Sequence, residues 1–164
     1  MVDVRQLAPG ETDLYKAIRL AALEDAPCAF GSNYEREQAF PREKWERRSS
    51  EGWEGKGSIC VVAIDGDRGV GIAGGTTPRD VQRAGQLVSL WVHADHRGTD
   101  VAARLVAQVE VWSFDRGHEQ LLLGVTERND RATRFFTKLG YVPYDDCLEG
   151  EDCIHILSKP LAVT

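Results

Sequence analysis

The stretch that most constrains the fold runs from Gln86 to Tyr141, because strand and helix patterns alternate along it. Its first part, QLVSLWV over 86–92, is apolar at most positions, which predicts a strand buried on both faces in the middle of a sheet. A turn of small residues follows and opens a helix over 99–116 with one apolar stripe. Free backbone N–H groups at the start of such a helix converge on one point, which makes a ready site for a pyrophosphate.

The remaining sequence extends this α/β pattern in both directions. A second apolar strand is expected over 120–125, and Asn129 is placed to cap the helix that follows it. Ser32 and Glu35 fit a capping box at the start of a short helix. Further strands are expected over 2–7, 58–64, 69–77, 141–144 and 154–158, and further helices over 11–25 and after Pro41. We therefore expect a single α/β domain over 1–164, with a mixed sheet of about six or seven strands flanked by about four helices.

The charge balance limits the partners of the chain. It has 26 acidic against 20 basic residues and a net charge of −6. Nucleic acids and anionic membranes bind basic surfaces, so this balance argues against both and accommodates a cationic partner. No apolar run approaches the roughly 20 residues of a membrane helix, and the start, MVDVRQLAPGE, lacks the apolar core of a signal peptide. We therefore expect a cytoplasmic protein.

Cysteine and histidine give no metal-binding pattern. None of the four cysteines forms a C-x-x-C pair, and Cys60 lies in an apolar strand as a small core residue. Cys147 and Cys153 could face each other across a hairpin, but a disulfide is rare in a cytoplasmic chain. His93 and His96 lack an evident third ligand, so we expect them to be exposed loop residues.

Two motifs resemble the GNAT superfamily of acyl-CoA-dependent N-acetyltransferases. The central signature of that family is (Arg/Gln)-x-x-Gly-x-(Gly/Ala), between the fourth strand and a long helix, and it matches here Arg97, Gly98, Thr99, Asp100, Val101 and Ala102. A second signature, Asn-x-x-Ala followed by an aromatic pair and Gly-(Phe/Tyr), matches Asn129, Ala132, Phe135, Phe136, Gly140 and Tyr141. The order of elements fits over nearly the whole chain. The early ALEDAPCAFGS resembles a bacterial subgroup of small proteins.

The resemblance implies a GNAT-like fold that binds acetyl-CoA as co-substrate and needs no metal. In that family the sheet is splayed between the fourth and fifth strands, and the thioester lies in the splay. A bulge in the fourth strand pairs with the pantetheine amides, and here it would fall near Leu90, Trp91 and Val92. The pyrophosphate would bind the turn Arg97–Ala102, and Asn129, Ala132, Phe135 and Phe136 would contact the cofactor from the next helix.

The same residues also have interpretations without a ligand. The segment from Arg97 to Asp100 is a good turn and helix start by itself. Trp91 and Trp112 are typical core residues, and Asn129 is a helix cap whether or not it meets a cofactor. Two motifs at the expected separation favour the cofactor-binding interpretation over a bare turn.

Two positions depart from the family pattern. Asp100 replaces a glycine, and its carboxylate beside a pyrophosphate would be a like charge. Phe136 stands where many family members have a tyrosine that protonates the departing thiolate, and a phenyl ring has no proton to give. Ser89 occupies the position where some relatives carry a glutamate base, and it is no base at neutral pH. Glu127 is the remaining catalytic candidate near the expected cleft.

Two hypotheses on function therefore remain. The first is an N-acetyltransferase that moves the acetyl group to a primary amine, small or peptidic and cationic, by direct attack in a ternary complex. The alternative is a degenerate acyl-CoA-binding or regulatory module. An acidic run, Asp145, Asp146, Glu149, Glu151 and Asp152, would border the acceptor cleft and attract an ammonium, or is only a solvated hairpin tip. A homodimer is compatible with the family.

Overall fold

In the computed structural model, strand pairing follows the alternation expected from the sequence. The structure describes residues 1–26, 32–79, 81, 83–126, 129–148 and 154–161. One seven-stranded mixed sheet has the order β1-β2-β3-β4-β5-β7-β6, and its only parallel neighbours among the described strands are β4 and β5. The strands are β1 (Val2–Gln6), β2 (Ser58–Asp65), β3 (Arg68–Thr76), β4 (Ala84–Val92), β5 (Gln120–Thr126), β6 (Val142–Leu148) and β7 (Ile154–Pro160). This confirms the expected fold class.

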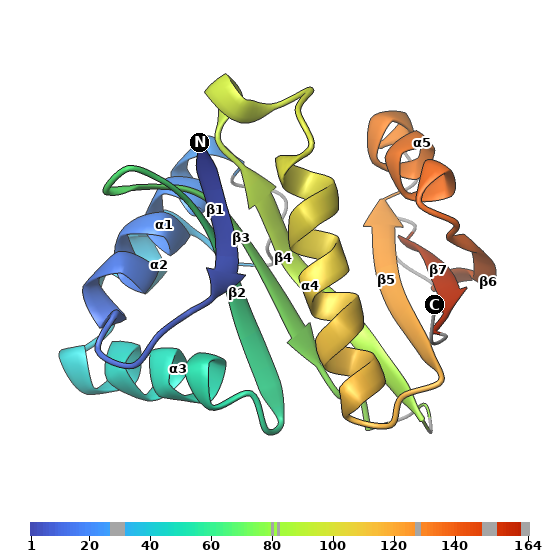
Figure 1. Ribbon diagram of the computed structural model, residues 1–164, viewed down its shortest axis with the longest axis horizontal. Helices are drawn as coiled ribbons and strands as arrows, with labels where there is room; N and C mark the ends of the chain where they lie inside the picture. The colour runs from blue at the N-terminus through green and yellow to red at the C-terminus, as the bar shows by residue number, and fades with distance from the viewer. Residues whose placement is uncertain (27–31, 80, 82, 127–128, 149–153, 162–164) are drawn as a thin grey trace.

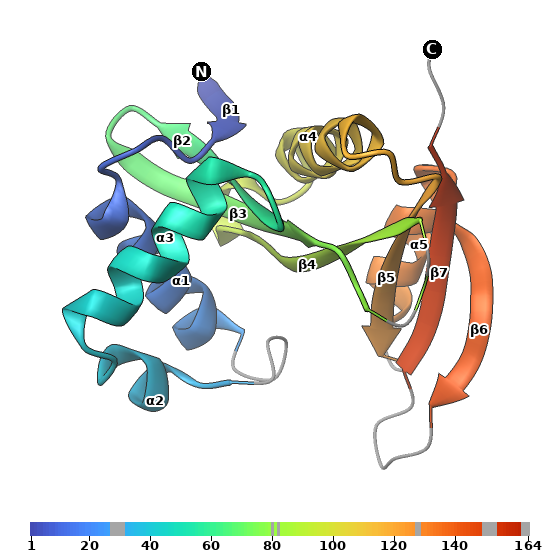
Figure 2. The same cartoon turned by 90° about the horizontal axis from the view of Figure 1, so that it is seen from below.

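Helices cover both faces of the first four strands (Figures 1 and 2). The described helices are α1 (Thr12–Asp25), α2 (Tyr34–Gln38), α3 (Arg42–Glu54), α4 (Val101–Asp115), α5 (Asp130–Lys138) and a short 3-10 turn, η1 (Ala94–His96). The apolar stripe of α4 packs on one face, with Val101, Leu105, Val109 and Trp112 buried as expected. On the other face, α1 and α3 contribute Tyr15, Ile18, Ala22 and Trp45 to a second core.

The sheet opens between β4 and β5. These two strands pair only through Ala84–Gln86 and Gln120–Leu122, and beyond that point they diverge (Figure 2). From residue 87 onward, β4 pairs with β3 alone among the described strands. The splay expected from the family resemblance is therefore present, and it leaves one backbone edge of β4 facing the gap.

The bulge in β4 lies slightly earlier than expected. Ile72 pairs with Trp91, but Gly74 pairs with Val88, so β4 carries one extra residue between those pairs. Ser89 occupies it with a φ of 57°, in the left-handed region that non-glycine residues rarely adopt. The bulge thus falls at Ser89 and Leu90 and overlaps the predicted Leu90–Val92 only at Leu90, because a family resemblance indicates the strand but not how this strand pairs with β3.

Two helix starts also differ from the sequence prediction. The long helix α4 begins at Val101 rather than residue 99, because Gly98 takes a φ of 78° and the chain turns there. The short helix α2 is capped by Asn33, whose side chain accepts a hydrogen bond from Arg36 N at 2.8 Å, and not by Ser32. Five α-helices are described, one more than expected, and α2 has only five residues.

Candidate active site

The first part of the site is the turn that opens α4. Gly98 has open space on its Cβ side and a positive φ, so it is required by the backbone turn rather than by packing. The first intrahelical bond runs from Arg104 N to Asp100 O at 3.0 Å. The N–H groups of Ala102 and Ala103 therefore precede the helical ladder and are free to meet an anion.

Asp100 occupies the N-cap position of α4. Its side chain makes no capping hydrogen bond and is exposed, while its backbone has an ordinary φ of −82°. Thr99 takes part of the capping role, because its Oγ1 accepts a hydrogen bond from Val101 N at 3.4 Å. The same hydroxyl donates to His96 O at 2.5 Å. The carboxylate therefore stands in solvent beside the helix start, where it interacts favourably with the helix dipole and unfavourably with a bound anion.

Arg97 is held in place at the base of the same turn. Its Nε donates to Val92 O at 3.0 Å, and its Nη2 pairs with Asp25. Trp91 Nε1 donates to the same carboxylate at 2.9 Å. Together the hydrogen bonds from Trp91 and Arg97 hold the pKa of Asp25 below its ordinary value. The end of α1 is thus tied to the turn, and the Trp91 ring lies in the core with α1, as a core residue would.

The helix α5 begins close to the same end of the sheet as the start of α4 (Figure 1). Asn129 Oδ1 accepts from Ala132 N at 3.1 Å, which confirms its capping role. Phe136 is buried, with its ring centroid 5.0 Å from Phe135 and 5.6 Å from Tyr141. The nearby Tyr141 hydroxyl donates to Glu110 at 2.8 Å, and burial followed by the Glu110 charge raises its pKa.

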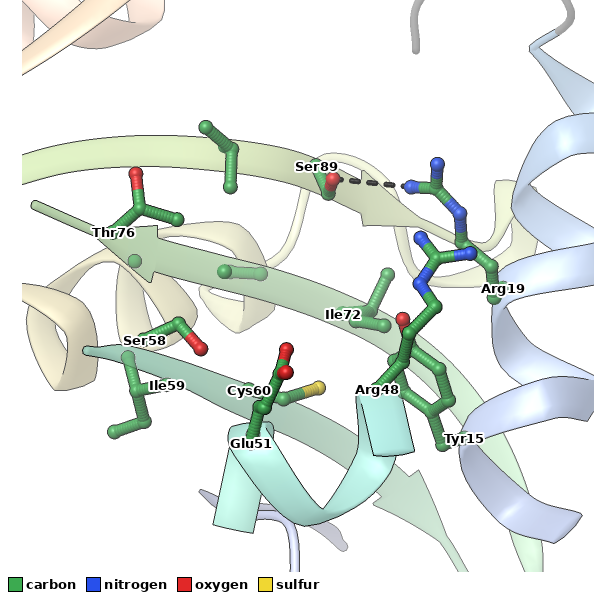
Figure 3. Close-up of a pocket in the computed structure, with 15 residues that line it drawn as sticks. Tyr15, Arg19, Arg48, Glu51, Ser58, Ile59, Cys60, Ile72, Thr76 and Ser89 are labelled. Atoms are coloured by element: carbon green, nitrogen blue, oxygen red, sulfur yellow. Dashed lines mark hydrogen bonds between the residues drawn. The ribbon is translucent and has the colours of Figure 1, made fainter. Parts of the chain in front are cut away.

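The second part of the site is a cavity of about 220 Å³ on the opposite face of the sheet (Figure 3). Its floor is formed by β2, β3 and β4, and its walls by α1 and α3. The β4 bulge contributes Val88 and Ser89, so the cavity reaches the strand that borders the splay. Other lining residues are Tyr15, Arg19, Arg48, Glu51, Ser58, Cys60, Ile72, Gly74 and Thr76.

A buried ionic cluster forms one end of this cavity. Arg19 binds Glu37 through two hydrogen bonds of 2.9 and 3.0 Å, and Arg48 Nη1 donates to the same carboxylate at 3.0 Å. Arg19 Nη1 also donates to Ser89 Oγ at 3.0 Å, which joins α1 to the bulge. Burial would raise the pKa of Glu37, but hydrogen bonds from Arg19 and Ser32 and both guanidinium charges hold it at about 2.

The other titratable groups of the cavity are mostly neutral. Cys60 is buried, which raises the pKa of its thiol to about 12, so it is a core residue as expected. Burial likewise raises the pKa of Tyr15. Glu51 extends from α3 near Cys60, away from the guanidiniums of Arg19 and Arg48 (Figure 3). The cavity therefore has a basic end at α1 and an acidic side chain farther along α3.

The sequence prediction did not identify this cluster. The sequence feature that could have revealed the cluster is Arg19, a charged residue between Ile18 and Ala22 on the buried side of α1. A charge on an apolar face requires a buried partner. That partner is Glu37, 18 residues away, and no periodicity in the sequence points to it.

Other predicted residues are placed differently or lie outside the description. His93 and His96 are only partly exposed, which corrects the expectation: Arg68 Nη2 lies 2.7 Å from His93 Nε2, and His96 Nε2 lies 3.2 Å from Asp65. No group of three metal-ligating side chains occurs among the described residues. Outside the described residues lie Glu127, Glu149, Glu151, Asp152 and Cys153, and the side chains of Asp145, Asp146 and Cys147 are likewise not described.

The comparisons with known proteins identify the family of the chain. Residues 19–141, more than half of the chain, match the family model described as Acetyltransferase (GNAT) family. The chain therefore belongs to the GNAT family of acetyltransferases. None of the curated proteins matches the sequence significantly. Within the described residues, no helix is long and apolar enough to cross a membrane.

Several solved structures share the fold. An acetyltransferase of the GNAT family from Streptococcus pneumoniae superposes with a TM-score of 0.79 at 16% identity, covering 99% of this chain and 100% of its own. The yncA protein of Salmonella typhimurium, solved with its cofactor acetyl-CoA, gives 0.78 at 13%, covering 100% and 96%. The PaiA N-acetyltransferase of Thermoplasma acidophilum, in complex with coenzyme A, gives 0.75 at 15%, covering 98% and 99%.

Proposed function

We propose that the protein transfers an acetyl group from acetyl-CoA to a primary amine on a small or peptidic cationic acceptor, by direct attack in a ternary complex. The observation that supports this most is the splay. It frees the edge of β4 beyond Gln86, between the α4 turn on one side and the cavity on the other. A co-substrate and an acceptor can thus approach the same strand from opposite faces.

The residues of the α4 turn fit acetyl-CoA. The backbone N–H groups of Ala102 and Ala103 can bind the pyrophosphate, and Gly98 leaves open space for it. The unpaired edge of β4 can hydrogen bond to the pantetheine amides. When bound, acetyl-CoA supplies the thioester carbon that the amine nitrogen attacks, so that an N–C bond forms, the C–S bond breaks and a proton passes to the thiolate. Phe136 packs near this end of the sheet without a proton to give.

An acyl-CoA-binding or regulatory module without efficient catalysis is the second candidate. Asp100 and Phe136 favour it, because one adds a like charge beside the anion site and the other removes a proton donor. Glu127 remains the proposed catalytic carboxylate. The acidic run from Asp145 to Asp152 is proposed to attract the ammonium group of the acceptor.

Calorimetric titration with acetyl-CoA, followed by thiol release with a panel of amines, separates the two candidates. An enzyme binds acetyl-CoA and releases coenzyme A faster when an amine is present. Binding without amine-dependent release supports the regulatory module. Absence of binding at millimolar acetyl-CoA contradicts the acetyltransferase and supports a regulatory module that uses no cofactor.

Replacing Asp100 tests the anion site directly. Asp100→Gly and Asp100→Asn both remove the like charge, and we expect each to tighten acetyl-CoA binding by about fivefold, since one charge pair at ~5 Å costs ~1 kcal/mol in water-like surroundings. Calorimetry at low salt measures the change. Asp115→Asn, at the far end of α4, is the matched control and should leave the affinity unchanged. Equal affinity in all variants would show that the Asp100 carboxylate points away from the bound anion or that the anion does not bind at this turn.

A further inference from the structure

The cavity between α1, α3 and the sheet has a positively charged wall that the proposed acetyl transfer does not explain. Arg19 and Arg48 both bind the carboxylate of Glu37. Glu37 is 2% exposed and belongs to the protein interior, whereas Arg48 faces the cavity with 27% of its side chain exposed. The guanidinium of Arg48 is therefore the charged group of this cluster that is most accessible to a molecule in the cavity.

The guanidinium of Arg48 is positioned by its neighbours and keeps hydrogen-bond donors that can bind a ligand. One nitrogen, Nη1, donates to Glu37, and the guanidinium lies 5.6–6.0 Å from the ring centres of Trp45, Phe40 and Tyr15. These contacts hold the guanidinium at the cavity wall. Glu37 is its only hydrogen-bond partner among the described residues, so other N–H donors of the fork can meet a ligand. A fixed planar fork is the usual partner of a carboxylate, because two parallel hydrogen bonds match its two oxygens.

We propose that the acceptor is a small amino acid-like molecule whose carboxylate binds Arg48, with its amine directed toward the β4 bulge. This proposal depends on the acetyl transfer proposed above and replaces its cationic acceptor with a zwitterion that carries both the reacting amine and a carboxylate. The cavity, about 220 Å³, is smaller than the roughly 300–1,000 Å³ of drug-sized sites, which suits a small metabolite. Val88 and Ser89 line it, so an acceptor anchored at Arg48 lies along the strand that borders the splay.

The cavity also distinguishes this class from a simple polyamine. A polyamine carries only positive charges, and the guanidiniums of Arg19 and Arg48 would repel it from the end next to Ser89. Glu51, farther along α3, can attract an ammonium on the side chain of the acceptor. A zwitterion whose carboxylate binds Arg48 is therefore complementary in charge to the described residues that line the cavity.

The test uses pairs of acceptors that differ only in the carboxylate. Free L-methionine, L-phenylalanine and L-lysine are each compared with their carboxamides, by kcat/KM for acetyl transfer and by the thermal shift of the protein. We expect the free acids to be preferred by about 10- to 100-fold, the range for hydrogen bonds to a charged group. The preference is informative because the carboxamides have the less basic amines and would otherwise react more readily.

Substitutions at Arg48 assign the preference to this residue. In Arg48→Gln we expect the ratio of acid to carboxamide to fall to about one, and in Arg48→Lys to an intermediate value, because lysine keeps the charge but loses the fork. Arg47→Gln is the matched control: it removes the same charge from α3 at an exposed position outside this cavity, and should keep the wild-type ratio. A loss of folding alone would lower both rates and leave the ratio unchanged.

Each outcome bears on the proposal. Equal use of acids and carboxamides by the wild-type protein overturns the carboxylate site and leaves acetyl transfer intact. So does a preference that survives in Arg48→Gln. If no member of the panel is acetylated or shifts the melting temperature, the amino acid class is overturned, and titration with acetyl-CoA shows separately whether the proposed function also fails.

Discussion

Glu37→Gln should lower the free energy of unfolding by about 3–5 kcal/mol, because it removes the negative charge that two guanidiniums share in the interior. For a chain of this size that corresponds to a melting temperature lower by roughly 6–20 °C. Thermal and urea denaturation measure it. Glu35→Gln, which alters an exposed carboxylate on the same helix, should change stability by less than about 0.5 kcal/mol.

The same carboxylate predicts a pH dependence of stability. The pKa of Glu37 is about 2 in the folded protein against an ordinary 4.5, so the unfolded chain binds its proton more readily. The contribution of ionised Glu37 to the free energy of unfolding is fully present above pH 4.5, and it is lost as the pH falls from about 4.5 toward about 2. The wild-type protein should therefore lose stability more steeply over this window than Glu37→Gln does. Parallel curves for the two proteins would show that Glu37 is not the group that titrates.

Phe136→Tyr should raise the turnover of acetyl transfer by about 10²-fold, the lower end of the effect of a positioned general acid. Phe136 is buried beside Tyr141, whose own hydroxyl is committed to Glu110 and cannot supply the proton. The affinity for acetyl-CoA should change little, because the substitution adds one hydroxyl and removes no contact.

Steady-state rates and calorimetry on the same preparations check this expectation. Phe114→Tyr is the control, since it adds the same hydroxyl to an exposed phenyl ring in the last turn of α4. A rate that drops in Phe136→Tyr would show that the pocket needs an apolar group there and that another donor operates. An equal gain in both variants would show that the effect does not depend on the position of the hydroxyl.

The sequence predicted the part of the site that is local in the chain. The apolar run of β4, the turn at Gly98, the amphipathic helix α4 and the cap at Asn129 all follow from residues within a few positions of one another. Glycines at helix ends and the buried stripe of α4 are local signals of the same kind. For this reason the strand–turn–helix unit could be assigned before any tertiary contact was known, and its resemblance to the GNAT family with it.

Details of backbone geometry were predicted less well. The bulge in β4 depends on how β3 pairs with it, and the left-handed residue proved to be Ser89, where no glycine marks the position. The cap of α2 moved by one residue, from Ser32 to Asn33, because both residues have side chains that can accept the hydrogen bond. In both cases the alternative backbone arrangements differ little in free energy, so the sequence does not decide between them.

By itself, then, the sequence determined the order of strands and helices, the buried faces of β4 and α4 and the turn at Gly98, because each depends on spacing along the chain. Only the tertiary structure decided which side chains line the cavity on the other face of the sheet. Arg19, Glu37 and Arg48 come from three helices and meet only when α1, α2 and α3 pack on the second face of the sheet. A buried charge needs a partner that is close in space, and that partner can lie anywhere in the sequence. For this reason the guanidiniums of Arg19 and Arg48, on the face of the sheet opposite α4, could not be assigned from the sequence.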